Sequence, residues 1–89
     1  MSESEEEIRR KRLKIRSWRR GTREMDLILG PFADQVLPGL SEAELAQYEA
    51  LLRESDHDLY QWISGQRPVP EGFAGLIGRI RANLDASHG

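Results

Sequence analysis

The sequence predicts an all-α fold, a compact five-helix bundle with short connections. Its apolar residues recur at helical spacing along the whole chain, and helix-capping patterns divide it into segments. Its 89 residues amount to one small domain, which buries only about 60 to 65% of the unfolded chain's surface. We therefore expect a single domain over residues 1–89, with an acidic, disordered head at about 1–7, a helical core at about 8–84 and a frayed tail at 85–89.

The first helix is expected from about Glu5 to Arg19. Acidic residues occupy its first turn and basic residues follow toward its C-terminus, which suits the helix dipole. Its apolar stripe is thin and consists of Ile8, Ile15 and Trp18 on one side. Gly21 then ends or redirects the chain.

The second helix is expected from about Thr22 to Leu37. Apolar residues lie on one face of it, at Met25, Ile28, Leu29, Phe32 and Val36. Pro31 lies inside this pattern, where it removes a backbone donor and clashes with the preceding turn. We therefore expect a kink near Gly30-Pro31 or a break into two short helices, and a stop at Pro38-Gly39.

The third helix is expected from Glu42 to about Glu54. Ser41 and Glu44 form a capping box, in which each side chain accepts from the other residue's amide, and Leu40 with Leu45 forms a hydrophobic staple. Its buried face is predicted to hold Leu45, Tyr48, Leu51 and Leu52.

The last two helices follow from similar signals. Ser55 is a predicted N-cap, and the short helix after it directs Leu59, Trp62 and Ile63 to one side before a left-handed Gly65. We interpret Tyr48 and Trp62 as core residues. After a loop with two prolines, the fifth helix runs from about Glu71 to Leu84. Its face holds Phe73, Ile77, Ile80 and Leu84, while Gly75 and Gly78 would allow a neighbour to approach closely.

The charge is unevenly distributed along the chain. Residues 1–23 hold nine bases and four acids, whereas residues 24–89 hold four bases and eleven acids. The nine bases all fall between Arg9 and Arg23, a stretch without an acid. Such a segment attracts a polyanion or an acidic surface, but it equally suits packing on the chain's own acidic body or a solvated helix face.

Several function classes find no support in these residues. The chain has no cysteine, so it has no disulfide, thiolate nucleophile or cysteine-ligated zinc. Its longest apolar run is three residues, Leu27 to Leu29, and its first residues lack the pattern of a targeting signal, which indicates a cytoplasmic protein without membrane insertion. The two histidines, His57 and His88, have no metal or catalytic partner by spacing. We expect no catalysis by this chain alone.

One short string suggests either a docking point or a turn. In Arg19-Arg20-Gly21-Thr22-Arg23-Glu24, Gly21 permits a turn and a close approach of another surface, and Arg20 presents a planar donor to a carboxylate or phosphate. Alternatively, Gly21 is the N-cap of the second helix, and Glu24, at its third position, favours the helix dipole.

The chain also resembles a known family. The string from Arg20 to Leu27, then Gly30-Pro31-Phe32, Leu51-Leu52 and residues 56–62, closely resembles the small flavinylation factors of succinate dehydrogenase. These are the bacterial relatives of mitochondrial succinate dehydrogenase assembly factor 2, and the similarity runs from about Leu13 to Leu84. It implies a five-helix, non-catalytic assembly chaperone. Such a chaperone binds the flavoprotein subunit of succinate dehydrogenase, and often that of fumarate reductase, and promotes covalent attachment of FAD to a histidine of that subunit.

The resemblance further implies a contact surface. The family's Arg-Gly-x-x-Glu motif falls on Arg20, Gly21 and Glu24, where Gly21 would let two backbones meet and the charged pair would supply hydrogen bonds. We add the neighbouring bases Arg16 and Arg23 as partner-binding residues. No tightly bound cofactor is expected, since FAD becomes attached to the partner, and the free chain is expected to be a monomer. A second family segment falls on Asp56, Asp58, Leu59, Tyr60 and Trp62, which we interpret as structural.

Two other classes of function remain as alternatives. The basic segment could lie along a nucleic-acid backbone, although a pI of about 5.7 and the lack of a helix-turn-helix signature argue against it. An interaction module such as an antitoxin would use the same surfaces.

Overall fold

The structure is a computed structural model that describes residues 4–88, with the backbone alone at Ser87 and His88. Its elements in chain order are α1 (Glu5–Trp18), α2 (Arg23–Val36), the 3₁₀ turn η1 (Leu37–Gly39), α3 (Glu42–Leu52), α4 (Asp56–Ile63), the 3₁₀ turn η2 (Glu71–Phe73) and α5 (Ala74–His88). The predicted all-α class is confirmed, and the described residues contain no strand. None of the described helices is long and apolar enough to cross a membrane.

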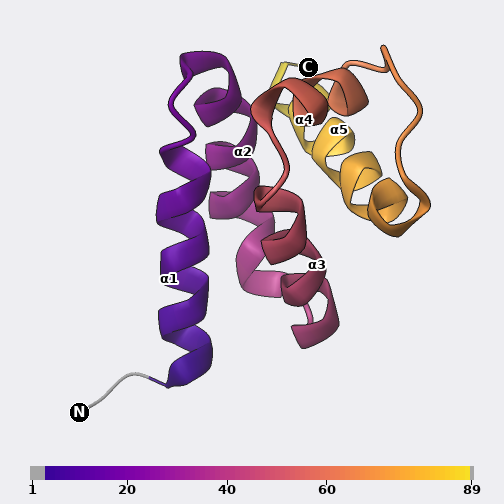
Figure 1. Cartoon of the computed structure of the whole chain (residues 1–89). Coiled ribbons are helices and arrows are strands. Elements are labelled where there is room, and N and C mark those ends of the chain that lie inside the picture. The colour runs from indigo at the N-terminus through magenta and orange to yellow at the C-terminus, as the bar shows by residue number, and fades with distance from the viewer. Residues whose placement is uncertain (1–3, 89) are drawn as a thin grey trace.

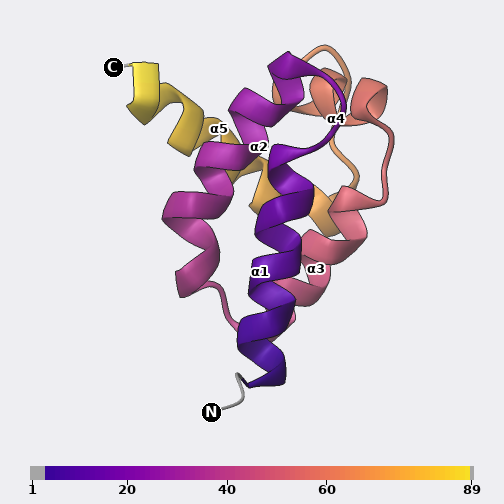
Figure 2. The same ribbon diagram turned by 90° about the vertical axis from the view of Figure 1, so that its left-hand side faces the viewer.

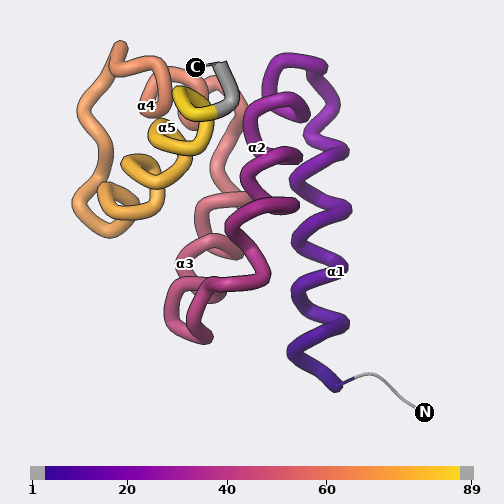
Figure 3. Tube along the Cα trace, turned by 180° about the vertical axis from the view of Figure 1, so that it is seen from behind, coloured from indigo at the N-terminus to yellow at the C-terminus, as the bar shows by residue number. Residues whose placement is uncertain are grey.

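Helix α2 lies at the centre of the arrangement. Figures 1 and 2 show α1 and α2 side by side and antiparallel. They are joined at one end of the molecule by a tight corner, which we define as residues 19–24. Helix α3 packs against α1, which lies between α2 and α3 in the view of Figure 2, while α5 packs against α2, and the short α4 packs on α5 near the α1–α2 corner. The view from behind in Figure 3 shows the long loop between α4 and α5 that brings α5 back across the other helices. The corner lies next to both ends of the α3–α4 connection, because the Arg20 side chain bonds the Leu52 carbonyl and Asp56.

The core is built from the predicted faces of α2, α3 and α4. Side chains from these three helices, from Leu13 and from α5 form one buried cluster, in which Leu29, Phe32, Leu45, Tyr48, Leu51, Leu59 and Ile77 are completely buried. The Phe32 and Tyr48 rings lie 5.6 Å apart between centroids, a distance typical of favourable aromatic pairs. Tyr48 and Trp62 are core residues, as predicted.

Local capping signals are confirmed where the sequence predicts them. The Ser41 hydroxyl accepts from the Glu44 amide at 3.2 Å, and the Ser41 amide donates to the Glu44 carboxylate at 2.9 Å. The hydrogen bond from that amide lowers the pKa of the Glu44 carboxyl. Ser55 caps α4 by accepting from the Asp58 amide, and Gly65 adopts the left-handed conformation, with φ of +81°. These starts and stops were predictable because each bond spans only a few residues.

Both terminal helices reach into the segments that the sequence predicts as a disordered head, at about 1–7, and a frayed tail, at 85–89. Residues 1–3 lie outside the described part, whereas Glu5 to Glu7 form the first turn of α1. Ser4 caps this turn by accepting from the Glu7 amide at 3.1 Å, and acidic side chains at a helix N-terminus are favoured by the dipole. At the other end, α5 continues to His88, beyond the expected stop at Leu84; Gly89, the last residue of the predicted tail, lies outside the described part.

The predicted apolar stripe of α1 is also wrong. Ile8, Ile15 and Trp18 are all exposed by more than a third, and α1 instead buries Leu13 and Ser17. Ser17 is accepted in the core because its hydroxyl donates to the Leu13 carbonyl at 2.7 Å and bonds the Tyr48 hydroxyl at 2.6 Å. The buried face of α1 is thus short and consists of one apolar and one polar side chain.

The glycines and the proline behave differently from expectation. A Cβ at Gly75 or Gly78 would meet nothing, so neither glycine serves a close approach. At Gly30 a Cβ would overlap the Trp18 indole ring, so this glycine is where α1 and α2 approach closely. Helix α2 also runs through Pro31 as one helical element, so the expected break into two short helices is wrong, while a kink near Gly30-Pro31 stays a prediction. Leu27, whose carbonyl loses its donor at Pro31, lies on the exposed side of the helix.

Candidate functional site

The corner between α1 and α2 carries the predicted site. Gly21 lies there with φ of +100°, a backbone conformation that other residues rarely adopt. Thr22, and not Gly21, is the N-cap of α2, because its hydroxyl accepts from the Met25 amide at 3.3 Å. Glu24 therefore lies at the second helical position and not the third, still where the dipole favours a carboxylate. The alternative interpretation of Gly21 as an N-cap is thus corrected.

Arg20 is directed into the molecule. Its Nε donates to Asp56 Oδ1 at 2.8 Å, and its two terminal nitrogens donate to the Leu52 and Glu54 carbonyls at 2.5 and 2.8 Å. Its side chain is only 12% exposed. Leu52 is the last residue of α3, where carbonyls have no helical partner, so Arg20 caps that helix end from another part of the chain. All three nitrogens of the guanidinium group are thus used within the chain.

Two aspartates hold this arginine, and the sequence did not single out either of them as a functional residue. Asp56, the first residue of α4, pairs with the guanidinium group, and Asp26 accepts from the Arg20 backbone amide at 2.6 Å. Their signal in the sequence was indirect, since both lie in strings that carry the family resemblance. Nothing local in the sequence could show that residues 36 positions apart meet.

The other motif residues face outward. Gly21, Arg23 and Glu24 are exposed, and a Cβ at Gly21 would meet no atom of the chain. In the part of the chain that the structure describes, the side chains of Arg23 and Glu24 make no hydrogen bond or ion pair. The corner therefore presents bare backbone at Gly21, flanked by a cation and an anion that remain available to another molecule.

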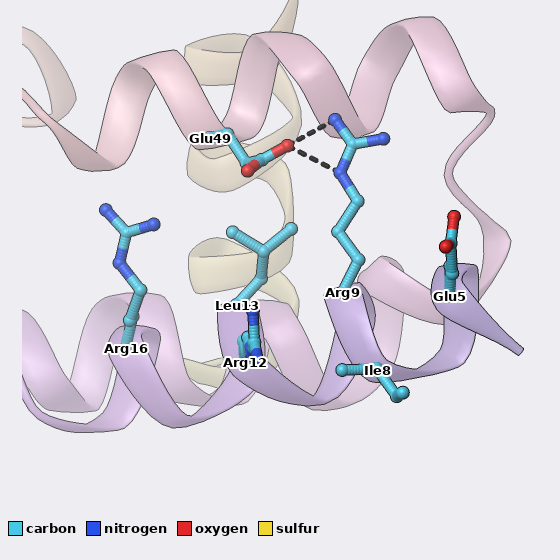
Figure 4. Close-up of a pocket in the computed structure, with 7 residues that line it drawn as sticks. All are labelled: Glu5, Ile8, Arg9, Arg12, Leu13, Arg16 and Glu49. Atoms are coloured by element: carbon cyan, nitrogen blue, oxygen red, sulfur yellow. Dashed lines mark hydrogen bonds and ion pairs between the residues drawn. The ribbon is translucent and has the colours of Figure 1, made fainter. Parts of the chain in front are cut away.

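Arg16 lies apart from this group. It is exposed in the last turn of α1 and lines a groove of about 520 Å³ between α1 and α3 with Arg9, Arg12 and Glu49. Figure 4 shows Arg9 and Arg16 projecting from α1 on the side of Glu49, with interactions drawn only between Arg9 and Glu49. The structure thus brings Arg20, Gly21, Arg23 and Glu24 together and leaves Arg16 on the neighbouring groove.

An apolar groove adjoins the corner on the side of α2 away from α1. It has a volume of about 320 Å³ and is lined by Glu24, Leu27 and Ile28 of α2, Tyr60 and Ile63 of α4, Ser64, and Leu84 of α5. Leu27 is 53% exposed and lies one helical turn beyond Glu24. The charged corner thus continues into apolar surface, a combination typical of protein contact surfaces.

The basic segment is partly neutralised by the chain itself. Arg9 pairs with Glu49, Lys14 with Asp34 and Arg20 with Asp56, so three bases contact acids of other elements. Arg10 pairs with Glu6 inside α1. Of the two interpretations of this segment, packing on the acidic body is thus realised for part of it, while Arg12, Arg16 and Arg23 remain exposed.

The described residues show no candidate metal site. No group of three or more histidine, aspartate and glutamate side chains lies close enough to hold a metal ion in this part of the chain. His57 is an exposed residue of the first turn of α4. The group with the strongest pKa shift is Tyr48, whose burial raises its pKa to about 12, and it belongs to the core.

Comparisons with known proteins point to one family. Residues 11–84 match the protein family described as "Flavinator of succinate dehydrogenase". The FAD assembly factor SdhE of Haemophilus ducreyi is 41% identical over 69 residues, which cover 76% of this chain and 84% of that protein. The mitochondrial succinate dehydrogenase assembly factor 2 of Danio rerio is 41% identical over 80% of this chain, and that of Dictyostelium discoideum 43% over 79%. The chain spans about half the length of these two mitochondrial relatives.

Proposed function

Because the chain belongs to the family of flavinators of succinate dehydrogenase, we propose that it binds the flavoprotein subunit of that enzyme and promotes covalent attachment of FAD to it. It is an assembly factor and not an enzyme in its own right. The bond forms between groups of the flavoprotein and its flavin, and this chain acts by binding.

The observation that supports this proposal best is the exposed corner at Gly21. Bare backbone lies there between the unpaired side chains of Arg23 and Glu24, and the apolar groove beginning at Glu24 extends the surface. Backbone without a side chain allows the partner to approach closely, and the charges beside it select the orientation of the partner. We propose that the flavoprotein subunit covers this surface, with Arg16 at its margin.

Binding promotes flavinylation only if it favours one conformation of the flavoprotein. A ligand shifts an equilibrium by no more than its difference in affinity for the two states. We propose that the chain binds more tightly to the conformation in which the flavin and the accepting histidine lie within reach of each other, so that bond formation becomes an intramolecular step.

The test is complementation in the host. A strain lacking the gene receives the wild-type chain, Gly21→Arg or Glu24→Ala, and covalent flavin on the flavoprotein subunit is read as ultraviolet fluorescence after denaturing electrophoresis. We expect the wild-type chain to restore the signal and both variants to lower it about tenfold or more, as losses at the centre of an interface do.

Two matched variants control for the substitutions themselves. Gly78→Arg introduces the same side chain at an exposed, open glycine of α5, and Glu42→Ala removes an exposed acid from the first turn of α3. Both should restore flavinylation fully. Because φ of +100° disfavours any side chain at Gly21, circular dichroism must show that Gly21→Arg is folded. Normal covalent flavin with folded Gly21→Arg and Glu24→Ala would refute the assignment of the surface.

Four finer statements belong to the proposal. The chain binds no cofactor of its own tightly, it is a monomer when free, it also serves the fumarate reductase flavoprotein, and it works in the cytoplasm. Flavin released from the purified free chain tests the first statement, and the mass of the free chain in solution tests the second. Copurification of the tagged chain with either flavoprotein tests the third.

A further inference from the structure

We propose that Asp26 and Asp56, which lie outside the Arg-Gly-x-x-Glu motif, are positioning residues for the flavoprotein contact and act through Arg20. The inference rests on the proposed function and assigns the motif arginine a new task. Arg20 holds the corner in its binding conformation from inside the chain, while Gly21 and Glu24 meet the partner.

The guanidinium group is committed to the α3–α4 connection. Its contacts with Asp56 and with the Leu52 and Glu54 carbonyls lie between 2.5 and 2.8 Å, and the side chain is 12% exposed. A direct bond to the flavoprotein would require breaking at least one of these contacts or using the small exposed remainder. A guanidinium group whose three nitrogens already have acceptors gains little free energy by exchanging those acceptors for groups of the partner.

The backbone of Arg20 is held by Asp26. The Arg20 amide donates to Asp26 Oδ1 at 2.6 Å, a bond that spans the segment containing Gly21, Thr22 and Glu24. Gly21 inside this segment has the weakest steric restriction of any residue type, so the corner would otherwise sample many conformations. The side chain of Arg20 ties the start of the segment to another element, and Asp26 ties it to α2.

A preformed corner improves binding because the entropy of ordering it is lost at folding and not at association. Removing either aspartate should therefore weaken the contact even where the variant is completely folded. An Arg20 side chain that contacts the partner directly makes the opposite prediction for Asp56→Ala, since Asp56 would then compete with the flavoprotein for the guanidinium group.

Arg81 provides a matched control within the same molecule. Its Nε donates to the Ile63 carbonyl at 3.0 Å and its terminal nitrogen to the Trp62 carbonyl, so it holds the end of α4 much as Arg20 holds the end of α3. Arg81 is remote from the motif in sequence and does not contribute to the Gly21 corner. Arg81→Lys and Arg20→Lys thus remove comparable internal contacts at two places.

The experiment measures binding of the full chain to the purified flavoprotein subunit, together with hydrogen exchange of the free chain. The variants are Asp56→Ala, Asp26→Ala, Asp56→Asn, Asp26→Asn, Arg20→Lys and Arg81→Lys, all at a temperature where circular dichroism shows them folded. We expect both alanine variants and Arg20→Lys to bind about tenfold more weakly or worse. The asparagine variants retain an oxygen acceptor and should recover most of the affinity. Arg81→Lys leaves the Gly21 corner intact and should lose clearly less affinity than Arg20→Lys.

Hydrogen exchange in the free chain separates positioning from direct contact. In Asp56→Ala and Asp26→Ala, the amides of Arg20 and Met25, which donate to Asp26 and to the Thr22 hydroxyl in the wild type, should exchange faster, while the amides of α5 should not change. If Asp56→Ala fails to fold, Asp26→Ala, which removes a single acceptor, carries the same prediction.

Wild-type affinity in a folded alanine variant would overturn the inference, as would weaker binding without faster exchange at the amides of Arg20 and Met25. Failure of the wild-type chain to bind the flavoprotein would instead refute the proposed function. In that case the exchange measurement still decides whether the aspartates hold the corner.

Discussion

At the scale of single residues, the buried polar pair Ser17 and Tyr48 shows how this small core tolerates hydroxyl groups. The Ser17 hydroxyl donates to the Leu13 carbonyl, so the Tyr48 hydroxyl is the donor in the 2.6 Å bond between them. Both side chains are completely buried, and each hydroxyl has a partner. The pair joins α1 to α3, a contact that the thin apolar face of α1 could not supply by itself.

The buried tyrosine predicts a loss of stability at alkaline pH. In the unfolded chain a tyrosine loses its proton near pH 10, whereas burial raises the pKa of Tyr48 to about 12 in the folded chain. The contribution of protonated Tyr48 to the free energy of unfolding is thus fully present below pH 10 and is lost as the pH rises from 10 to 12. By pH 12 the free energy of unfolding should have fallen by about 2 to 3 kcal/mol from this group. Urea denaturation at several pH values measures it.

Tyr48→Phe and Tyr60→Phe make a matched pair for this measurement. Tyr48→Phe removes the titrating group and should flatten the decline between pH 10 and 12. Tyr60→Phe removes a tyrosine that is only partly buried and should leave the decline as in the wild type. Equal pH dependence in the two variants would show that Tyr48 is not the group responsible.

At the scale of helices, the contact between α1 and α2 depends on a glycine in an unbroken helix. Gly30 lets the Trp18 ring lie directly on the α2 backbone, and the indole nitrogen donates to Asp34 on the same helix at 3.2 Å. Lys14 also pairs with Asp34. Three side chains of two helices thus meet on one side of the core, next to Pro31.

Alanine substitutions at two helical glycines should have opposite effects. Gly78→Ala adds helix propensity in open space and should raise stability by about 0.5 to 1 kcal/mol. Gly30→Ala gains the same propensity but forces the Trp18 ring away, and overpacking of this kind costs about 1 to 3 kcal/mol. Thermal unfolding gives the two stabilities, and tryptophan fluorescence reports the ring. A Gly30→Ala chain as stable as Gly78→Ala, with unchanged fluorescence, would contradict the close packing.

At the scale of the whole molecule, the opposite charges of the two sequence regions partly meet each other. Contacts of Arg9, Lys14 and Arg20 with acids of α2, α3 and α4 hold α1 against the body. A basic segment used in this way is a poor ligand for a phosphate backbone, because affinity for nucleic acid depends on cations free to displace counterions. The structure therefore weakens the nucleic-acid alternative, and the family assignment does so independently.

Freeing the paired bases should increase the affinity of the chain for nucleic acid. The double variant Asp34→Asn with Glu49→Gln releases Lys14 and Arg9, and we expect severalfold tighter binding to duplex DNA, with a salt dependence steeper by about one to two counterions. Fluorescence anisotropy over a range of salt concentrations measures both.

Glu42→Gln with Glu71→Gln is the matched control. It changes the net charge by the same amount without releasing a base that forms a described ion pair, and it should bind DNA more weakly than the first double variant. Equal binding by the two double variants would mean that net charge alone decides, and that the internal ion pairs do not sequester the segment.

The sequence by itself determined the features that depend on neighbours a few positions away. The helical class, the capping box at Ser41, the cap at Ser55, the buried faces of α3 and α4, and the left-handed Gly65 follow from bonds and spacings within about one turn. The family resemblance also lies in the order of residues and was confirmed over 11–84. Packing decided the rest. The side of α1 that is buried, the close approach at Gly30 and the inward direction of Arg20 depend on which helices meet, and the partner of the Arg20 side chain lies 36 residues away. Helical spacing shows which residues share a face, but only the tertiary arrangement decides what that face contacts.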